Sequence, residues 1–158
     1  MNIVKIENKK HFAVLGHLTQ AYEAEFSKIT QKLPNQDGVF EPDTLIDENH
    51  EGYLLFNDDQ IPIGFCIKGT VGTCHDISEF YIIPALRKNG WGKRFAFAIF
   101  NKYRGPWQVR QIMGADRARK FWQSSIQDYT SGQFEEVLSS DPDWGQVFLQ
   151  TFENKKVV

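Results

Sequence analysis

The sequence predicts one α+β domain in which helices cover a mixed β-sheet. Its length of 158 residues is that of a single domain, residues 1–158, and is enough to bury a substantial core. Short apolar runs alternate along the chain with segments in which apolar residues recur at helical spacing. Residues that favour turns separate these segments, and no internal repeat interrupts them. These three observations indicate a mixed sheet with helices, of the α+β or α/β class.

The first half of the chain is expected to hold a strand, a long helix and a β-hairpin. The run "NIVKIE" (2–7) is typical of a strand, and Asn8 suits the N-cap of a helix that begins near Lys9. The segment "LPNQDGVFEPD" ends this helix with two prolines and a glycine. The runs "GYLLF" (52–56) and "IPIGFCIKG" (61–69) then form two strands joined by a turn at "NDDQ".

The second half is expected to alternate strands and helices before two closing strands. The run "DISEFYII" (76–83) is a strand that meets Pro84, a helix covers about 91–103, and "WQVRQIM" (107–113) is the next strand. Apolar residues at helical spacing mark a further helix: Ala118, Phe121, Trp122, Ser125, Ile126 and Tyr129. The runs "FEEVLSS" and "VFLQTFE" close the chain as strands. The element order is β-α-(α)-β-β-β-α-β-α-β-β, with the bracketed helix optional.

Composition and charge favour a cytoplasmic protein without nucleic acid, membrane or metal as a partner. The net charge of −2 gives no basic stripe for nucleic acid, although Arg87, Lys88, Lys93 and Arg94 form a local basic group that suits a small anion. The two cysteines are expected to be free, and no signal peptide or membrane span is expected. No group of His, Cys and Asp residues has the spacing of metal ligands.

The segment "RKNGWG" (87–92) joins the end of a predicted strand to the start of a predicted helix. The first turn of a helix has backbone N–H groups without partners and the positive end of the helix dipole, so it attracts anions. Gly90 and Gly92 allow an anion to approach the backbone closely and permit unusual φ angles. This pattern is typical of a pyrophosphate site.

The segment "RKNGWG" has other interpretations besides an anion site. It is also compatible with a simple turn that carries a solvated basic face. The sequence G-x-x-x-x-G-K-[ST] of a nucleotide-triphosphate loop is absent, and so is the third glycine of a dinucleotide fingerprint. The glycine segment alone therefore leaves the choice between an anion site and a plain turn open.

The wider run "EFYIIPALRKNGWGKRFAFAIF" resembles the central motif of the GNAT family, the acetyl-CoA-dependent N-acetyltransferases. Ile82-Ile83-Pro84 matches the end of the family's strand, and the family's glycine loop is matched by Arg87, Gly90 and Gly92. Farther along, "ADRARKFWQSSI" resembles the family's N-x-x-A-x-x-F-Y helix. The resemblance covers nearly the whole chain. It implies a central, mostly antiparallel sheet of about six to seven strands, splayed at the middle and flanked by about four helices.

The resemblance also implies where acetyl-CoA binds. The backbone amides of the loop hold the pyrophosphate, and these belong to Arg87, Lys88, Asn89, Gly90, Trp91, Gly92 and Lys93. The backbone of Ile82 and Ile83 pairs with the pantetheine arm, and an amide near Ile82 steadies the thioester oxygen. The helix that contains Ala118 and Trp122 passes beside the pantetheine and its sulfur.

A general base is needed to take a proton from the attacking ammonium, and Glu79 is the candidate. It matches a carboxylate that many family members carry here, and alternation places it on the same strand face as Tyr81. Burial on that face is expected to raise the pKa of Glu79. A solvated carboxylate at this position, Asp76 or His75 as the base, or water, remain the alternatives. Glu23 and Glu25 are read as a solvated helix face that could attract a cationic acceptor.

The chain departs from the family pattern at two positions that matter for chemistry. The family's asparagine falls on Ala115, and the tyrosine that donates a proton to the leaving thiolate falls on Trp122. An indole cannot act as that proton donor. Tyr81 is the candidate substitute acid.

The function that the resemblance implies is transfer of an acetyl group from acetyl-CoA to a primary amine by direct attack in a ternary complex. The acceptor is a small molecule or a peptide. The alternative is a protein of the same fold that binds an acyl-CoA as sensor or scaffold without turnover, which Trp122 favours. Either a monomer or a homodimer is compatible with the sequence.

Overall fold

The computed structural model describes residues 1–155, which fall into two compact units. Unit 1 contains Met1–Lys68 and Glu79–Asn89, and unit 2 contains Gly69–Ser78 and the chain from Gly90 onward. Strands β3 (Pro62–Val71) and β4 (Cys74–Ile82) run through both units. Among residues 1–155, no helix is both long enough and apolar enough to cross a membrane.

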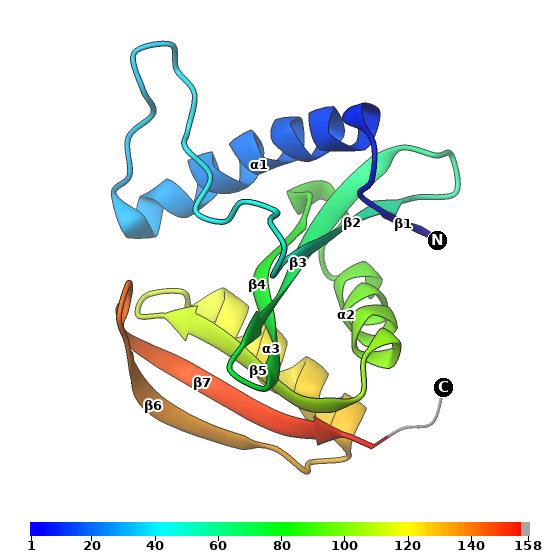
Figure 1. The fold of residues 1–158 in the computed structure, drawn as a ribbon, viewed down its shortest axis with the longest axis vertical. Helices are drawn as coiled ribbons and strands as arrows, with labels where there is room; N and C mark the ends of the chain where they lie inside the picture. The colour runs from blue at the N-terminus through cyan, green and yellow to red at the C-terminus, as the bar shows by residue number, and fades with distance from the viewer. Residues whose placement is uncertain (156–158) are drawn as a thin grey trace. The chain divides into compact units, whose positions relative to one another are not determined.

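Unit 1 starts with strand β1 (Asn2–Lys5) and the long helix α1 (Lys9–Thr30), which Figure 1 shows in blue. Asn8 caps α1 as expected, because its side chain accepts a hydrogen bond from the His11 amide at 2.9 Å. Strand β2 (Glu51–Phe56) pairs antiparallel with both β1 and β3. A single turn of 3₁₀-helix, η1 (Pro84–Leu86), follows β4.

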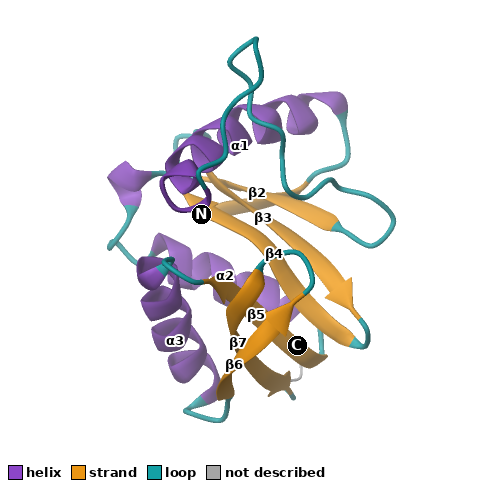
Figure 2. Cartoon of the chain, turned by 90° about the vertical axis from the view of Figure 1, so that its left-hand side faces the viewer, coloured by secondary structure: helices purple, strands orange, loops and turns teal. Residues whose placement is uncertain are grey.

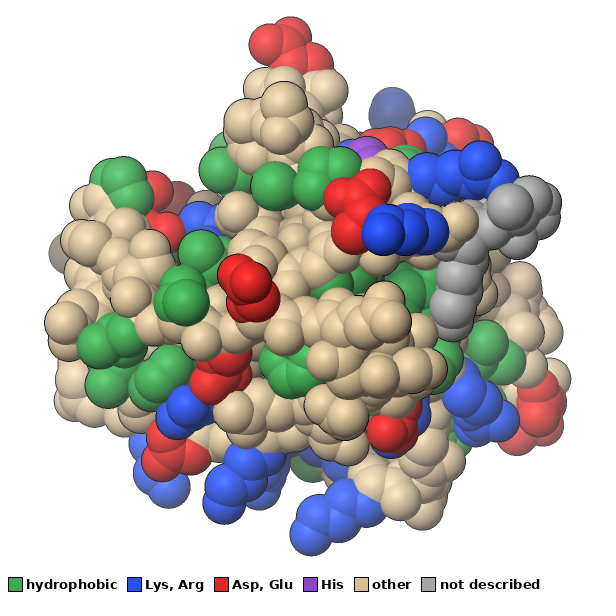
Figure 3. Space-filling model, turned by 90° about the horizontal axis from the view of Figure 1, so that it is seen from below, with side chains coloured by type: hydrophobic (Ala, Val, Ile, Leu, Met, Phe, Trp, Pro, Cys, Tyr) green, Lys and Arg blue, Asp and Glu red, His purple; other side chains and the backbone are tan. Residues whose placement is uncertain are grey.

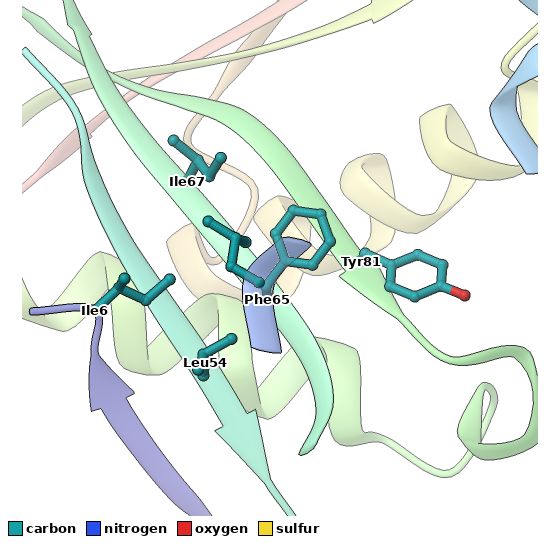
Figure 4. Close-up of a cluster of buried hydrophobic side chains, with 6 residues drawn as sticks. Ile6, Leu54, Phe65, Ile67 and Tyr81 are labelled. Atoms are coloured by element: carbon teal, nitrogen blue, oxygen red, sulfur yellow. The ribbon is translucent and has the colours of Figure 1, made fainter. Parts of the chain in front are cut away.

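The core of unit 1 lies where α1 packs on one face of these strands. Ile6, Leu54, Phe65, Ile67 and Tyr81 are buried together (Figure 4), and Leu15 of α1 packs against them. The aromatic rings of Phe65 and Tyr81 lie 5.8 Å apart between centroids. Burial of these large side chains supplies most of the driving force that fixes β4 against α1.

Unit 2 contains the remaining elements, which are drawn from green to red in Figure 1. They are α2 (Trp91–Lys102), β5 (Gly105–Ile112), α3 (Asp116–Thr130), β6 (Glu135–Asp141) and β7 (Gly145–Asn154). Strand β7 pairs antiparallel with both β5 and β6 (Figure 2). Phe100 of α2 contacts both Trp107 and Phe152, with ring centroids 4.9 Å and 5.0 Å apart. Aromatic rings are thus a large part of the core of unit 2.

The strands hydrogen-bond in the order β1-β2-β3-β4-β5-β7-β6. Strands β4 and β5 pair in parallel over only three residue pairs, from His75–Trp107 to Ile77–Val109. Strand β4 continues to Ile82 and β5 to Ile112 beyond these pairs. The expected mostly antiparallel sheet, with a break in the pairing of these two strands, is therefore confirmed.

The helices differ from expectation in detail. The described residues contain three α-helices and the short η1, and the segment 31–50 holds no helix, so the optional second helix is absent. Strand β1 ends at Lys5, because the chain must leave the sheet before Asn8 caps α1. Figure 3 shows one face of the molecule, where basic and acidic side chains are interspersed among apolar ones.

Candidate functional site

The backbone at the start of α2 is open and left-handed. Lys88 has a φ of 67° and Gly90, the N-cap residue, a φ of 77°. As a glycine, Gly90 has no side chain that could cap the helix, and the first turn of α2 holds no acidic residue. A Cβ atom at Gly90 would meet nothing within 4 Å. The first helical amides are therefore set up to accept an anion from outside.

Basic side chains surround this helix start, and two of them have partners within unit 2. Lys93 forms an ion pair with Asp128 of α3 at 2.5 Å. The Arg94 guanidinium lies 4.7 Å from the centre of the half-buried Trp91 ring, a cation–π contact that gives Trp91 a packing role. Lys88 and Asn89 are exposed. The local charge is thus positive, although Asp128 offsets part of it.

Arg87 does not belong to the open part of the loop. Its guanidinium donates two hydrogen bonds to Glu25, at 2.6 Å and 3.0 Å, and its Nε donates to the Ile82 carbonyl at 2.8 Å. Its backbone amide donates to the Pro84 carbonyl at 3.2 Å. The expectation that the Arg87 amide holds an anion is therefore wrong, because that donor is already used. The amides from Lys88 to Lys93 are the ones that remain candidates.

At the end of β4, the backbone groups of Ile82 and Ile83 point to opposite edges of the strand. The Ile83 amide donates to the Ile63 carbonyl of β3 at 2.9 Å. The expectation that Ile83 pairs with a pantetheine arm through this amide is therefore wrong. Alternation along the strand turns the backbone groups of Ile82 to the opposite edge. A Cβ atom at Gly64 would lie 2.3 Å from the Tyr81 carbonyl, so only glycine allows β3 to approach β4 this closely.

Glu79 is buried in unit 1, with 8 % of its surface exposed. Its Oε1 accepts a hydrogen bond from the Thr44 hydroxyl at 2.8 Å, and the Tyr22 hydroxyl also donates to the carboxylate. Burial raises the pKa of Glu79 to about 7, an effect that the two hydrogen bonds oppose and that the charges of Asp43 and Glu23 reinforce. Glu79 thus has the pKa of a general base that works near neutral pH.

An ionic group centred on Lys32 and the buried Glu23, which the sequence did not reveal, lies beside Glu79. Lys32 donates to Glu23 at 3.0 Å, to Asp43 at 2.6 Å and to the Glu41 carbonyl at 2.6 Å. Glu23 is 2 % exposed, so its interpretation as part of a solvated helix face was wrong. A hollow of about 10 Å³, the size needed for one water, is lined by residues of this group together with Tyr22, Thr44 and Glu79.

Tyr81 and the α3 residues Trp122 and Ala118 are buried or partly buried. Tyr81 is buried at 5 %, and burial first, then the charge of Glu25, raises its pKa, so the hydroxyl stays protonated at neutral pH. Trp122 is also buried at 5 % and contacts the rings of Phe100 and Phe121. Ala118 lies on α3, partly buried.

The two alternative bases are engaged elsewhere. Asp76 is fully buried and accepts hydrogen bonds from Arg110, Gln108 and Ser78. His75 Nε2 lies 2.8 Å from the Arg104 carbonyl, and its ring packs against Trp107. Asp76 and His75 therefore have structural roles in unit 2. Within residues 1–155, no group of three or more His, Cys, Asp or Glu side chains could hold a metal ion.

Comparisons with known proteins agree on the fold. Neither known protein families nor curated proteins match the sequence. Among solved structures, the ribosomal-protein-S18-alanine N-acetyltransferase from Escherichia coli is 11% identical, with a TM-score of 0.62, covering 99% of this chain and 96% of that one. The spermidine N-acetyltransferase from Vibrio cholerae in complex with CoA and spermine is 8% identical, with a TM-score of 0.60, covering 98% and 96%.

A third similar structure carries the family name. A protein from Bacteroides thetaiotaomicron assigned to the acetyltransferases of the GNAT family is 17% identical, with a TM-score of 0.58, covering 99% of this chain and 89% of that one. The chain therefore has the fold of GNAT N-acetyltransferases, and the resemblance seen in the sequence is confirmed at the level of the fold.

Proposed function

We propose that this protein is an N-acetyltransferase that moves an acetyl group from acetyl-CoA to a primary amine. The observation that carries the proposal is the start of α2, where an uncapped, left-handed Gly90 and a first turn without acidic residues leave backbone amides open to an anion. On a fold shared with acetyltransferases, a diphosphate is the anion that this position suits.

The residues present fit the coenzyme at several points. The amides of Lys88, Asn89, Gly90, Trp91, Gly92 and Lys93 hold the diphosphate, and the exposed Lys88 adds positive charge. The Ile82 amide faces the edge of β4 that is opposite β3 and pairs with the pantetheine arm, while the Ile82 carbonyl is already held by Arg87 Nε. When bound, acetyl-CoA supplies an activated acetyl thioester.

Glu79 prepares the acceptor amine for attack. Its pKa of about 7 means that about half of the carboxylates are ionised at neutral pH and ready to accept a proton from the ammonium. The hollow beside Glu79 suits one water, so the proton moves to the carboxylate either directly or through that water. Tyr81 is the candidate proton donor, since its hydroxyl is protonated at neutral pH.

The acceptor is a small-molecule or peptide amine. Proteins of the same fold act on spermidine and on the alanine of ribosomal protein S18, which supports both classes. Binding of an acyl-CoA without turnover is the second candidate function, and the buried Trp122 at the position of the family's proton-donating tyrosine favours it. We expect a monomer or a homodimer.

Release of free thiol from acetyl-CoA tests the choice between the two functions. The protein is first titrated with CoA by calorimetry and then incubated with acetyl-CoA and a panel of amines that includes a polyamine, an amino acid and a peptide N-terminus. If the protein is an acetyltransferase, release of the thiol should depend on one class of amine and should be strongly reduced in Glu79→Gln. Binding of CoA with no amine-dependent release from any class would favour the sensor or scaffold instead.

A further inference from the structure

The segment 31–50 has no helix or strand, yet several hydrogen bonds fix it to α1. The Gln20 side chain holds the backbone of Phe40 from both sides, with Nε2 donating to the Phe40 carbonyl at 2.9 Å and Oε1 accepting from its amide at 2.8 Å. The amide of Asp43 donates to Glu23 at 3.3 Å. This part of the segment therefore has a defined position in unit 1.

Lys32 adds a second attachment close to Thr44. Its ammonium has three acceptors within hydrogen-bond distance, one each from Glu23, Glu41 and Asp43, which matches its three protons. Burial lowers the pKa of Lys32, but the hydrogen bonds to Asp43 and Glu23 outweigh that effect and raise it, so the ammonium stays charged. Because Asp43 precedes Thr44 directly, this contact fixes the Thr44 backbone.

Thr44 in turn reaches the side chain of Glu79, 35 residues farther along the chain, and Tyr22 of α1 donates to the same carboxylate. Burial, followed by the charge of Glu79, holds the pKa of Tyr22 well above its ordinary value, so its hydroxyl remains a donor. The hollow beside these groups is no larger than one water. The carboxylate thus has little freedom to turn.

We propose that Thr44 and Tyr22 are positioning residues, whose hydroxyl groups donate to the Glu79 carboxylate and keep it in its ionised form for proton transfer, and that the segment 31–50 supplies one of these two donors. This inference rests on the proposed role of Glu79 as the base. It extends that role to a loop in which the sequence shows no motif.

The groups that face Glu79 determine in which direction a substitution moves the titration of its carboxyl group. Tyr22 and Glu23 face it from α1, Asp43 and Thr44 from the segment 31–50, and β3 contributes the apolar Phe65 and Ile67. A donor to the carboxylate favours its charged form, so removal of the Thr44 hydroxyl moves the titration of Glu79 to higher pH. Removal of the Asp43 charge moves it to lower pH.

Thr44→Val is the decisive variant, because it keeps the shape of the side chain and removes only the hydroxyl. Thr44→Ser restores the donor, and Thr73→Val makes the same change at an exposed turn position. The ratio of kcat/KM between variant and wild type is measured from pH 6 to 9.5 with the amine that the wild type uses. Taking this ratio at each pH cancels the titration of the amine itself.

We expect Thr44→Val to lower kcat/KM about fivefold at pH 7 and to leave it unchanged near pH 9.5, as for a shift of about one pH unit. Thr44→Ser and Thr73→Val should follow the wild type at every pH. An equal loss for Thr44→Val at all pH values, or failure of Thr44→Ser to restore the profile, would overturn the proposal and leave Thr44 a merely structural residue.

A second measurement separates this inference from the proposed function. The carboxyl ¹³C signal of Glu79, identified by its loss in Glu79→Gln, is titrated in protein without substrate. A midpoint that rises in Thr44→Val supports the positioning role even if no acceptor has been found, and an unchanged midpoint contradicts it. Failure of the proposed function gives a different result, namely no binding of CoA by the wild type.

Discussion

Arg87 and Glu25 form an ion pair joined by two hydrogen bonds, with Nη1–Oε1 and Nη2–Oε2 distances of 2.6 Å and 3.0 Å. The same guanidinium donates to the Ile82 carbonyl and lies 5.5 Å from the centre of the Tyr81 ring. Arg87 therefore ties the end of β4 to α1 within unit 1. Its position in the glycine loop suggests an anion ligand from sequence, but its contacts are internal.

Replacement of Arg87 should reduce stability more than coenzyme affinity. Arg87→Lys keeps the charge but loses the paired geometry, so we expect unfolding to become easier by about 1 kcal/mol, a figure reduced because Glu25 is partly exposed. Urea unfolding and calorimetry with CoA measure the two effects in Arg87→Lys and in the wild type. A variant that keeps its stability and loses CoA binding would place the guanidinium on the phosphates.

A negative side chain at Gly90 should abolish binding of CoA. Gly90→Glu adds a carboxylate beside the amides proposed to hold the diphosphate, and nothing within 4 Å of the new Cβ hinders it sterically. Gly90→Gln is the matched control, since it brings the same side-chain size and the same strain at a φ of 77° but carries no charge. Calorimetry should show no binding for the first variant and affinity within about threefold of wild type for the second. Equal affinities for both would move the diphosphate site elsewhere.

The stability of the protein should fall as the pH rises through neutrality, because of Glu79. The pKa of this residue is about 7 in the folded chain against 4.5 ordinarily, so folding favours its protonated form. The resulting stabilisation is complete below pH 4.5 and is lost as the pH rises through 7, a change of at most about 3 kcal/mol. In Glu79→Gln this component should vanish when urea unfolding at pH 5 and pH 8 is compared. An unaltered pH dependence in the variant would mean that Glu79 titrates normally.

The Asp76–Arg110 pair should contribute strongly to the stability of unit 2. Asp76 is fully buried and bonds Arg110 through both carboxylate oxygens, while Arg110 also bonds Asp141 at 2.7 Å. Asp76→Ala leaves the guanidinium with one carboxylate, and we expect a loss of about 3 kcal/mol in the free energy of unfolding. The exposed Asp143→Asn should change it by less than about 0.5 kcal/mol. Similar values for the two variants would show that the pair carries little energy.

The elements of the fold were predictable because each leaves a local pattern. Helical spacing marks α1 and α3, Asn8 marks a helix start, and Pro84 marks the end of β4. The burial and raised pKa of Glu79 were also predictable, since side chains along its strand alternate between two faces and burial of a carboxylate raises its pKa. Only the optional early helix was absent, because prolines and glycine in 31–50 leave that segment irregular.

The partners of the site residues were not predictable. Thr44 lies 35 residues from Glu79, and Glu25 lies 62 residues from Arg87. Such contacts depend on how α1, the irregular segment and β4 pack together, and no periodicity records this. The burial of Glu23 has the same cause, because its partner Lys32 lies beyond the end of the helix and turns back toward it.

Calorimetric titration of the wild-type protein with CoA and, separately, with pantetheine tests most directly whether the start of α2 holds a diphosphate. The two ligands share the pantetheine arm, and CoA adds the diphosphate together with a 3′-phosphorylated adenosine. The titration is therefore repeated with Gly90→Glu, in which the contribution of the diphosphate should be lost. The account predicts saturable binding of CoA and a loss of at least about tenfold in affinity for pantetheine, since charge-assisted bonds to several amides are missing. Equal affinity for the two ligands, or no binding of CoA, would contradict it.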